Sequence, residues 1–448
     1  MVVGLGPGGE ATANRLAREG VEVVGIEKGL VGGECPFYGC VPSKVMSRAA
    51  YSLVEARRVN ELAGSATVEP SWTPVAEHIR TVATNDWDDS KKVAALERRG
   101  ARVVRGHGTV TGPGTVEVDG EVFRARRAVV VAPGAAPSTP PIPGLADTPF
   151  WNNRDVMQLT ELPSSLAIIG AGTIGAELAQ VFARFGVRVT MLEAADRILA
   201  NEEPEVSPLI AEVFAREGIR VMPQIEISHV AYDDGGFVID LGDEQVTADK
   251  LLVATGRSPV TDGSGLESVG VDTDVRFLPT DSRMRVQVDG EPLDWLHAVG
   301  DVVGKGAFSH TALYQSYVAV QHILGKDGPE ADFRAIPRVT FTDPEVGAVG
   351  MTEEQAREAG KDVRTGIARL DRIARGNLHQ VGNEGMVKVV AEGDLLVGAT
   401  SVGPMGGEVL SMLSTAVHAR VPISTLQSMI YAYPTFHEAV RKALADLD

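Results

Sequence analysis

Two copies of one glycine pattern constrain what this chain can fold into. In the first copy, Gly4, Gly6 and Gly9 follow a short apolar run, and Glu27 ends the next apolar run. The second copy consists of Gly170, Gly172, Gly175 and Glu193. The first glycine and the acid are 23 positions apart in both copies. Equal spacing in two places predicts one structural unit used twice.

Each copy reads as strand, glycine turn, helix and strand. The first predicts a helix over residues 8–19 and a strand over 21–26, and the second predicts strands over 166–169 and 188–192 around a helix that ends near 185. Only glycine permits this tight turn and lets a pyrophosphate approach the free N–H groups of the helix N-terminus. An acid at the end of the second strand can bind ribose hydroxyls. We therefore expect an α/β chain with two dinucleotide-binding folds.

Length and charge narrow the class of protein. A chain of 448 residues is long enough for about three domains. A net charge of −18 argues against nucleic acid or an anionic membrane as a partner. No apolar run approaches the roughly 20 residues that span a bilayer, and the start lacks the basic region of a signal peptide. We expect a cytoplasmic protein, and no Cys/His cluster has the spacing of metal ligands.

The only two cysteines, Cys35 and Cys40, lie five positions apart, just after the first glycine unit. Two thiols held this close can cycle between dithiol and disulfide, which stores two electrons. In a reducing compartment such a disulfide is more often catalytic than structural. The pair is therefore the first candidate for the chemistry.

The segment 32–44, GGECPFYGCVPSK, resembles the redox-active disulfide segment of the flavoprotein disulfide reductases, which include dihydrolipoamide dehydrogenase, glutathione reductase and mercuric reductase. The resemblance covers essentially the whole chain. Residues 132–134 and 254–257 resemble the family's two A-x-G strand ends, residues 296–301 its second FAD motif, and residues 337 to the end its dimerisation domain. It implies two Rossmann-like domains and a C-terminal α+β dimerisation domain. The expected boundaries are 1–150 and 266–330 for the FAD-binding domain, 151–265 for the NAD(P)H-binding domain, and 331–448 for the dimerisation domain.

The resemblance implies FAD at the first glycine unit, NAD(P)H at the second, and a homodimer. The residues expected to bind FAD are Gly4, Gly6, Gly9, Glu27, Lys44, Gly134 and Asp301. The residues expected to bind the nicotinamide coenzyme are Gly170, Gly172, Gly175 and Glu193. Glu193 favours NADH because its carboxylate repels a 2′-phosphate. Arg188 and Arg197 lie nearby, so NADPH stays an alternative.

The resemblance also assigns catalytic roles. Cys35 attacks the substrate and Cys40 contacts the flavin. A thiolate is the reactive form, so a thiol pKa below the free value is expected, lowered by the helix N-terminus near Val41 and by Lys44. Lys44 is expected beside the flavin and paired with Glu177, because a buried ammonium group needs a partner.

The chain departs from the family pattern at its C-terminal motif. Dihydrolipoamide dehydrogenase and glutathione reductase carry His-Pro-Thr-x-x-Glu, whereas this chain has Tyr433 in the histidine position and Glu438 in the glutamate position. A phenol has a pKa near 10 and is a poor base at neutral pH. Tyr433 is thus either a proton donor or a packing residue, and both interpretations stay open. Glu34 and Thr173 also replace the threonine and the gating tyrosine that are usual in the family.

The function expected from these residues is electron transfer from NAD(P)H through FAD to Cys35–Cys40 and on to a disulfide or other small acceptor. Two alternatives remain at this point. One is an NAD(P)H-dependent reductase of quinones or metal ions, and the other is a flavin redox sensor with low turnover. Tyr433 favours the alternatives, whereas the cysteine pair, Lys44 and Glu177 favour the disulfide reductase.

Overall fold

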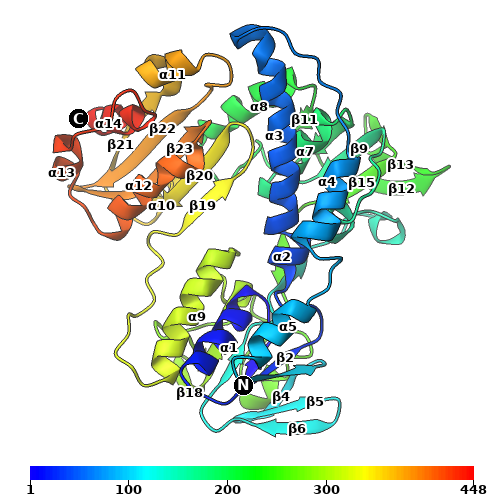
Figure 1. The fold of residues 1–448 in the computed structure, drawn as a ribbon, viewed down its shortest axis with the longest axis vertical. Helices are drawn as coiled ribbons and strands as arrows, with labels where there is room; N and C mark the ends of the chain where they lie inside the picture. The colour runs from blue at the N-terminus through cyan, green and yellow to red at the C-terminus, as the bar shows by residue number, and fades with distance from the viewer. Residues whose placement is uncertain (448) are drawn as a thin grey trace. The chain divides into compact units, whose positions relative to one another are not determined.

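The structure is a computed structural model that describes residues 1–447. Contacts group the chain into two compact units, each assembled from three separate stretches of sequence. The first unit contains residues 1–43, 77–138 and 257–333, and the second contains residues 44–76, 139–256 and 334 onward. Figure 1 follows the chain from blue at the N-terminus to red at the C-terminus. The domain boundaries expected near residues 150, 265 and 330 stay a prediction.

The first unit is built on a six-stranded sheet with the order β17-β18-β7-β1-β2-β3. Neighbouring strands are parallel except for the edge pair β17–β18. In chain order the strands are β1 (Val2–Val3), β2 (Val23–Glu27), β3 (Ala101–Arg105), β7 (Val129–Val131), β17 (Arg285–Val288) and β18 (Glu291–Ala298). Val2, Val129 and Leu296 are fully buried, as expected for the central strands of a parallel sheet.

Two helices of the first unit lie side by side, as Figure 1 shows for α1 (Pro7–Arg18) and α9 (Ser309–Ile323). The Thr12 hydroxyl of α1 donates to the Ser316 hydroxyl of α9 at 2.9 Å. This unit also contains the helices α2 (Glu34–Tyr38) and α5 (Ser90–Glu97), the π-helix η1 (Ile79–Ala83), and the short 3-10 helices η3 (Leu266–Val269) and η4 (Asp301–Val303). It further contains the sheet β4 (Thr109–Gly112), β5 (Thr115–Val118) and β6 (Glu121–Arg124), and the ribbon β8 (Ala135–Pro137) with β16 (Arg257–Pro259). The division between the units falls inside α3 (Cys40–Leu62).

The second unit contains the second glycine pattern on a parallel sheet with the order β11-β10-β9-β15. Its strands are β9 (Ser165–Ile169), β10 (Arg188–Leu192), β11 (Arg220–Met222) and β15 (Lys250–Val253), with helices α7 (Thr173–Arg184) and α8 (Val206–Arg216). An antiparallel sheet of β12 (His229–Asp233), β13 (Gly236–Asp240) and β14 (Gln245–Ala248) accompanies it. Each expected strand and helix end lies within one or two residues of the observed one, because glycine turns delimit these elements.

The C-terminal part of the second unit is a five-stranded antiparallel sheet with the order β19-β20-β23-β22-β21. Its strands are β19 (Pro337–Thr340), β20 (Glu345–Gly350), β21 (Val363–Arg369), β22 (Met386–Glu392) and β23 (Leu395–Gly403). Its helices are α10 (Glu353–Glu358), α11 (Ala374–His379), α12 (Gly406–His418), α13 (Ile423–Ser428) and α14 (His437–Ala445). The predicted α/β class with a C-terminal α+β domain is confirmed.

A buried lysine joins this sheet to the segment that precedes α8. The Lys388 side chain on β22 is only 4% exposed, and its Nζ lies 2.9 Å from Glu203, 2.8 Å from Glu205 and 3.0 Å from Glu353. Burial alone would lower the pKa of Lys388, but the hydrogen bonds to these carboxylates outweigh it and raise the pKa. Lys388 and Glu203 thus form a buried ion pair within the second unit, and the more exposed Glu205 and Glu353 complete the cluster around the lysine.

None of the helices within residues 1–447 is both long enough and apolar enough to cross a membrane.

Candidate functional site

The first glycine turn is shaped by close backbone contacts. Gly4 has φ +88°, and a Cβ there would lie 2.3 Å from the Ala132 carbonyl oxygen. A Cβ on Gly9 would lie 1.9 Å from the Gly4 carbonyl oxygen, so only glycine lets α1 start this close to β1. Gly6, by contrast, has nothing within 4 Å of its Cβ position. The middle glycine therefore leaves open space beside the N-terminus of α1.

The second turn repeats these three relationships. Gly170 has φ +104° and a Cβ position 2.6 Å from the Ala254 carbonyl oxygen, and the Cβ position of Gly175 lies 2.0 Å from the Gly170 carbonyl oxygen. Gly172 has nothing within 4 Å of its Cβ position. Both units thus present an open turn before a helix, which is the geometry that accepts a phosphate group.

The two strand-end acids have matching partners as well. Glu27 and Glu193 each accept two backbone N–H bonds, one from the glycine turn and one from the residues after the strand. The donors are Leu5 at 2.6 Å and Gly29 at 2.7 Å for Glu27, and Ala171 at 2.5 Å and Ala195 at 2.8 Å for Glu193. Each acid therefore holds its glycine turn in place, a role that the sequence pattern alone did not suggest.

The cysteines lie on two consecutive helices, the short α2 and the long α3. Cys35 lies in α2 and Cys40 is the first residue of α3, and the two sulfurs are not joined in a disulfide. The Cys40 Sγ lies 3.6 Å from the Oγ of Ser309, the first residue of α9. The segment also touches the first glycine turn, because a Cβ on Gly33 would lie 2.8 Å from the Gly6 Cα. The thiols therefore lie in the unit that carries the first open turn.

The pKa of Cys35 moves in the direction opposite to the one expected. Its hydrogen bond with Cys40 and its burial raise the pKa of the Cys35 thiol, and a contact with Ser309 opposes this only in part. The expected lowering left out the hydrogen bond with the second sulfur, which is the largest cause of the raised pKa of Cys35.

Lys44 and Glu177 form an ion pair in the second unit, with Nζ 2.5 Å from Oε2. The other carboxylate oxygen accepts the backbone N–H of Phe341 at 2.9 Å, and the Lys44 Nζ lies 4.5 Å from the centre of the Phe341 ring. The Glu177 side chain is 6% exposed and that of Lys44 is 34% exposed. Glu177 thus has both oxygens paired, as a buried carboxylate requires.

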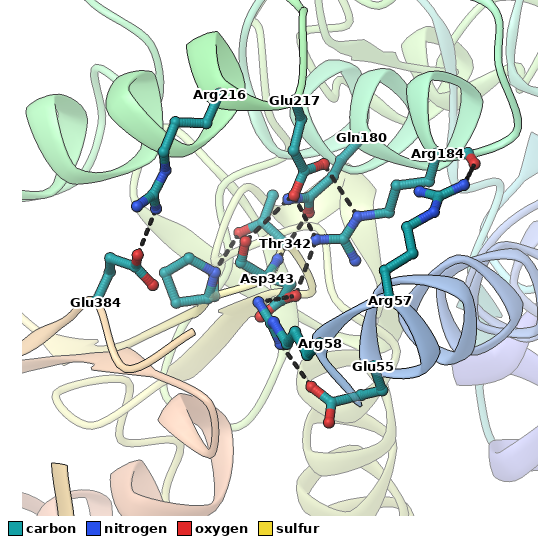
Figure 2. Close-up of polar contacts among 11 residues, drawn as sticks. Glu55, Arg57, Arg58, Gln180, Arg184, Arg216, Glu217, Thr342, Asp343 and Glu384 are labelled. Atoms are coloured by element: carbon teal, nitrogen blue, oxygen red, sulfur yellow. Dashed lines mark hydrogen bonds and ion pairs between the residues drawn. The ribbon is translucent and has the colours of Figure 1, made fainter. Parts of the chain in front are cut away.

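A buried polar network holds the chain just beyond Phe341, and Figure 2 shows its members. The Asp343 carboxylate binds Arg58 of α3 at 3.0 Å and Arg184 of α7 at 2.8 Å. Gln180 of α7 exchanges two hydrogen bonds with the Asp343 backbone, at 2.7 and 2.8 Å. Arg184 also pairs with Glu217 at 2.7 Å. Sequence reasoning missed this network.

A sequence signal for the network exists on α7. Glu177, Gln180 and Arg184 are buried polar residues at positions i, i+3 and i+7, which share one helix face. All three contact the segment from Phe341 to Asp343. A polar stripe on an otherwise apolar helix marks such a contact, and the pattern was present in the sequence.

Arg257 lies between two acids of the first unit. Its guanidinium is 3.9 Å from Glu34 and 4.0 Å from Asp301, and it also donates to the Ala135 carbonyl beside Gly134. Burial raises the pKa of Asp301, and Arg257 opposes that rise. A polar ligand that donates to Asp301 would offset the cost of burying this carboxylate.

Two buried polar atoms at the start of α9 have no partner within residues 1–447. They are the Thr311 Oγ1 and the Gln315 Nε2. The Gln315 Oε1 accepts the backbone N–H of Gly300 at 2.6 Å, which places this side chain beside the residue before Asp301. Unpaired buried polar groups are rare in native proteins. The Gln315 Nε2 therefore fits a bound polar group next to Asp301, and the Thr311 Oγ1 lies one helical turn earlier on α9.

The C-terminal motif lies in the second unit. The Tyr433 side chain is 75% exposed and has no hydrogen-bond partner among the described residues. Glu438 accepts the backbone N–H of Ala374 at 3.2 Å and lies 3.7 Å from the Lys442 Nζ. The structure therefore does not bring Glu438 to Tyr433. Ile430, three positions before Tyr433 in the sequence, is 98% exposed.

Comparison with known proteins gives two family matches. Residues 1–322 match the pyridine nucleotide-disulphide oxidoreductase family, and residues 336–444 match its dimerisation domain. Mercuric reductase of Acidithiobacillus ferrooxidans is 33% identical over 99% of this chain and 81% of its own length. Dihydrolipoyl dehydrogenase of Thermus scotoductus is 32% identical over 99% of this chain and 96% of its own length.

Two solved structures have the same fold. The HOCl-induced flavoprotein disulfide reductase RclA of Escherichia coli superposes with a TM-score of 0.84 at 25% identity, over 100% of this chain and 98% of that chain. LpdA of Mycobacterium tuberculosis gives a TM-score of 0.86 at 25% identity, over 100% of this chain and 99% of that chain.

Proposed function

Because this chain belongs to the pyridine nucleotide-disulphide oxidoreductase family, we propose that it is an NADH-dependent flavoenzyme whose Cys35–Cys40 pair reduces a small disulfide. The family uses FAD and a pyridine nucleotide. The observation that carries the proposal is the pairing of two open glycine turns with a cysteine pair located beside one of them. When bound, FAD supplies a two-electron carrier between the reduced nicotinamide and the disulfide.

The first unit supplies the residues that would hold FAD. Gly6 leaves room for the pyrophosphate, Glu27 lies at the strand end that meets a ribose, and Asp301 would accept from the ribityl chain. The unpaired atoms of Thr311 and Gln315 support a bound polar group there. We accordingly propose that residues 1–150 and 266–330 form the FAD-binding domain, 151–265 the coenzyme domain and 331–448 the dimerisation domain.

Glu193 and Arg197 support NADH as the coenzyme. Glu193 places a carboxylate at the end of β10, where a 2′-phosphate would be repelled. The Arg197 guanidinium donates to the carbonyls of Ala200 at 2.8 Å and Glu202 at 3.2 Å, so it is already engaged. We expect a higher kcat/KM with NADH than with NADPH, and a wild-type preference for NADPH would contradict the assignment.

The thiol chemistry starts from Cys35. Its hydrogen bond with Cys40 and its burial raise the pKa of its thiol, and the Cys40 Sγ lies beside the Ser309 hydroxyl. Cys35 must lose its proton to attack an acceptor disulfide, and the second thiol then closes the Cys35–Cys40 bond. The acceptor gains two electrons and two protons and leaves as two thiols. A group that accepts the Cys35 proton is therefore needed, and Tyr433 is a weak candidate.

A second candidate function is the reduction of a quinone or a metal ion. Tyr433 favours it, because its phenol is exposed and Glu438 is already bonded to Ala374. Such acceptors take electrons without an incoming thiol that must be deprotonated. The relatives named mercuric reductase are similar over 99% of this chain. A flavin redox sensor would show none of these activities at a useful rate.

One set of assays separates these functions. Steady-state oxidation of NADH is measured with lipoamide, small disulfides, Hg(II) and quinones as acceptors. The disulfide reductase requires both cysteines, so Cys35→Ser and Cys40→Ser should abolish disulfide turnover. Retained disulfide turnover in these variants would refute the proposal. A long-wavelength absorption band on anaerobic reduction, lost in Cys40→Ser, would independently place Cys40 beside the flavin.

We also propose a homodimer formed through the C-terminal domain. The exposed apolar side chains of Met429 and Ile430, close to Tyr433 in the sequence, support it, because exposed apolar side chains are typical of an interface. A dimer would let Tyr433 of one subunit approach Cys35 of the other. Light scattering that finds an active monomer would exclude this arrangement. The expected cytoplasmic location stays a prediction.

A further inference from the structure

The turn between the two cysteines is held by a tryptophan that the proposed mechanism does not use. Helix α2 ends at Tyr38, and Gly39, with φ −139° and ψ −114°, separates it from α3, which starts at Cys40. Carbonyl groups in the last turn of a helix lack an intrahelical partner. The Trp87 indole N–H donates to the Phe37 carbonyl at 3.0 Å, so this orphan acceptor is satisfied.

The ring of Trp87 makes a second contact with the same turn. It stacks on the Tyr38 ring with centroids 6.4 Å apart and an interplanar angle of 24°. Trp87 therefore binds the main chain before Tyr38 and the side chain of Tyr38 itself. Both contacts fall between Cys35 and Cys40.

The backbone at Trp87 and the two residues before it has an unusual conformation. Asn85, Asp86 and Trp87 have φ values of +53°, +55° and +55°, so three consecutive non-glycine residues are left-handed. For a bulky residue this conformation is a genuine outlier. Such conformations persist only where the surroundings over-determine them, and they cluster at functional sites. The contacts of the indole ring are the feature that this backbone makes possible.

The residues after Trp87 hold the start of the same segment. The Asp89 carboxylate accepts the backbone N–H of Val31 at 2.5 Å and pairs with Arg105 at 2.7 Å. Lys92 passes beside Gly32, whose Cβ position lies 2.8 Å from the Lys92 Cε, and binds Glu10 at 2.9 Å. Residues 85–92 thus contact residues 31–38 at several points.

We propose that Trp87 is a positioning residue that holds the turn between Cys35 and Cys40 in the geometry from which the two sulfurs form and break their bond. The inference rests on the proposed redox role of the pair. Closing the bond removes two electrons and two protons from the thiols, and an oxidised thiol such as glutathione disulfide takes them up as two thiols. A held turn raises the effective concentration of one thiol at the other, so it favours the disulfide.

The test measures the thiol–disulfide equilibrium of the pair in the holoenzyme. Wild-type and variant proteins are equilibrated in glutathione buffers of defined ratio, and the oxidised fraction is read by differential alkylation and mass spectrometry. Trp87→Phe keeps a ring on Tyr38 but removes the indole N–H. Its matched control is Trp72→Phe, which removes an indole bond of the same length, 3.0 Å, to the Leu159 carbonyl in the second unit.

We expect Trp87→Phe to shift the equilibrium toward the dithiol by roughly two- to tenfold, the range for the loss of one hydrogen bond. Trp72→Phe should match the wild type. Equal equilibria in all three proteins would overturn the proposal. If Trp87→Phe does not fold, Tyr38→Leu removes the ring on which Trp87 stacks. A shift toward the dithiol in this variant would support the proposal, and an unchanged equilibrium would overturn it. A wild-type pair that never closes into a disulfide would instead refute the proposed function.

Discussion

The Lys44 ammonium group lies 2.5 Å from the carboxylate of Glu177, so residues 133 positions apart in the chain form one ion pair. The backbone N–H of Phe341 occupies the other oxygen of Glu177. Glu177 therefore holds the lysine ammonium group in place as a positive charge. A fixed charge of this kind can stabilise negative charge that develops next to it.

Loss of the Glu177 charge should slow the reductive half-reaction. Glu177→Gln removes the anion that pairs with Lys44, so we expect reduction of the bound flavin by NADH to slow on the order of tenfold or more. Stopped-flow absorbance measures the rate. Glu212→Gln, at an exposed position of α8, is the control. Equal rates in both variants and the wild type would show that the ion pair is only structural.

Asp343 is the anion on which two buried arginines depend. Asp343→Asn leaves Arg58 and Arg184 without this carboxylate, and breaking a buried pair typically costs about 3–5 kcal/mol of stability. We therefore expect a clear fall in the urea midpoint, monitored by circular dichroism. Asp371→Asn removes an exposed carboxylate, which is 51% accessible and pairs with Arg369, and should change the midpoint little. A midpoint equally insensitive to both changes would contradict the importance of the network.

His297 should make the protein acid-sensitive. The side chain is fully buried on β18, its Nε2 lies 3.0 Å from the Nδ1 of His322, and burial lowers its pKa from 6.5 to about 3. Between these values the unfolded chain binds the proton and the folded protein does not, so stability falls as the pH falls. The group should cost about 2 kcal/mol between pH 7 and pH 5.

Urea unfolding at the two pH values, followed by tryptophan fluorescence, measures this effect. His297→Gln cannot titrate, so its stability should fall less than that of the wild type over the same interval. The burial of His322 lowers its pKa too, so some acid sensitivity should remain in the variant. An unchanged pH dependence in His297→Gln would assign the sensitivity to other groups.

Tyr433 should limit disulfide turnover. A phenol is a poor base at neutral pH, so lipoamide reduction should be slower than quinone reduction by the same enzyme. General acid–base catalysis contributes roughly 10²–10⁴-fold, and Tyr433→His should recover about tenfold of it, because Glu438 is bonded to Ala374 and orients a new ring poorly.

Tyr433→Phe separates the two interpretations of this residue. A slower reaction with the native acceptor would identify a proton donor, and an unchanged rate would identify a packing residue. Lipoamide turnover as fast as quinone reduction, and unaltered in both variants, would show that this position does not limit the enzyme.

Much of the fold could be predicted because its key contacts are local in sequence. The glycine turn, the helix after it and the strand-end acid all lie within one short segment. The proximity of the turn that starts at Gly4 to the acid Glu27 can therefore be expected from the spacing alone. The C-terminal sheet was expected only through resemblance. Its strands pair across long intervals, such as β20 with β23, and a single sequence does not fix such a register.

The site was predictable to the extent that its residues carry distinctive chemistry. The two cysteines and the contact of Lys44 with Glu177 were expected. Asp343 and Trp87 were missed because their roles depend on distant partners, Arg184 and Phe37. The direction of the Cys35 pKa was missed for a similar reason, since it depends on the sulfur of Cys40, which lies on the next helix.

The buried cluster around Lys388 has a consequence for how the enzyme can be divided. Two of its three carboxylates, Glu203 and Glu205, come from outside the dimerisation region that the family comparison delimits at residues 336–444. Cutting the chain at that border would leave the buried Lys388 ammonium group with Glu353 as its remaining carboxylate partner. The two regions that sequence comparison distinguishes therefore share one ion cluster, and a chimera that exchanges the dimerisation region between relatives should keep the acidic residues before α8 matched to Lys388.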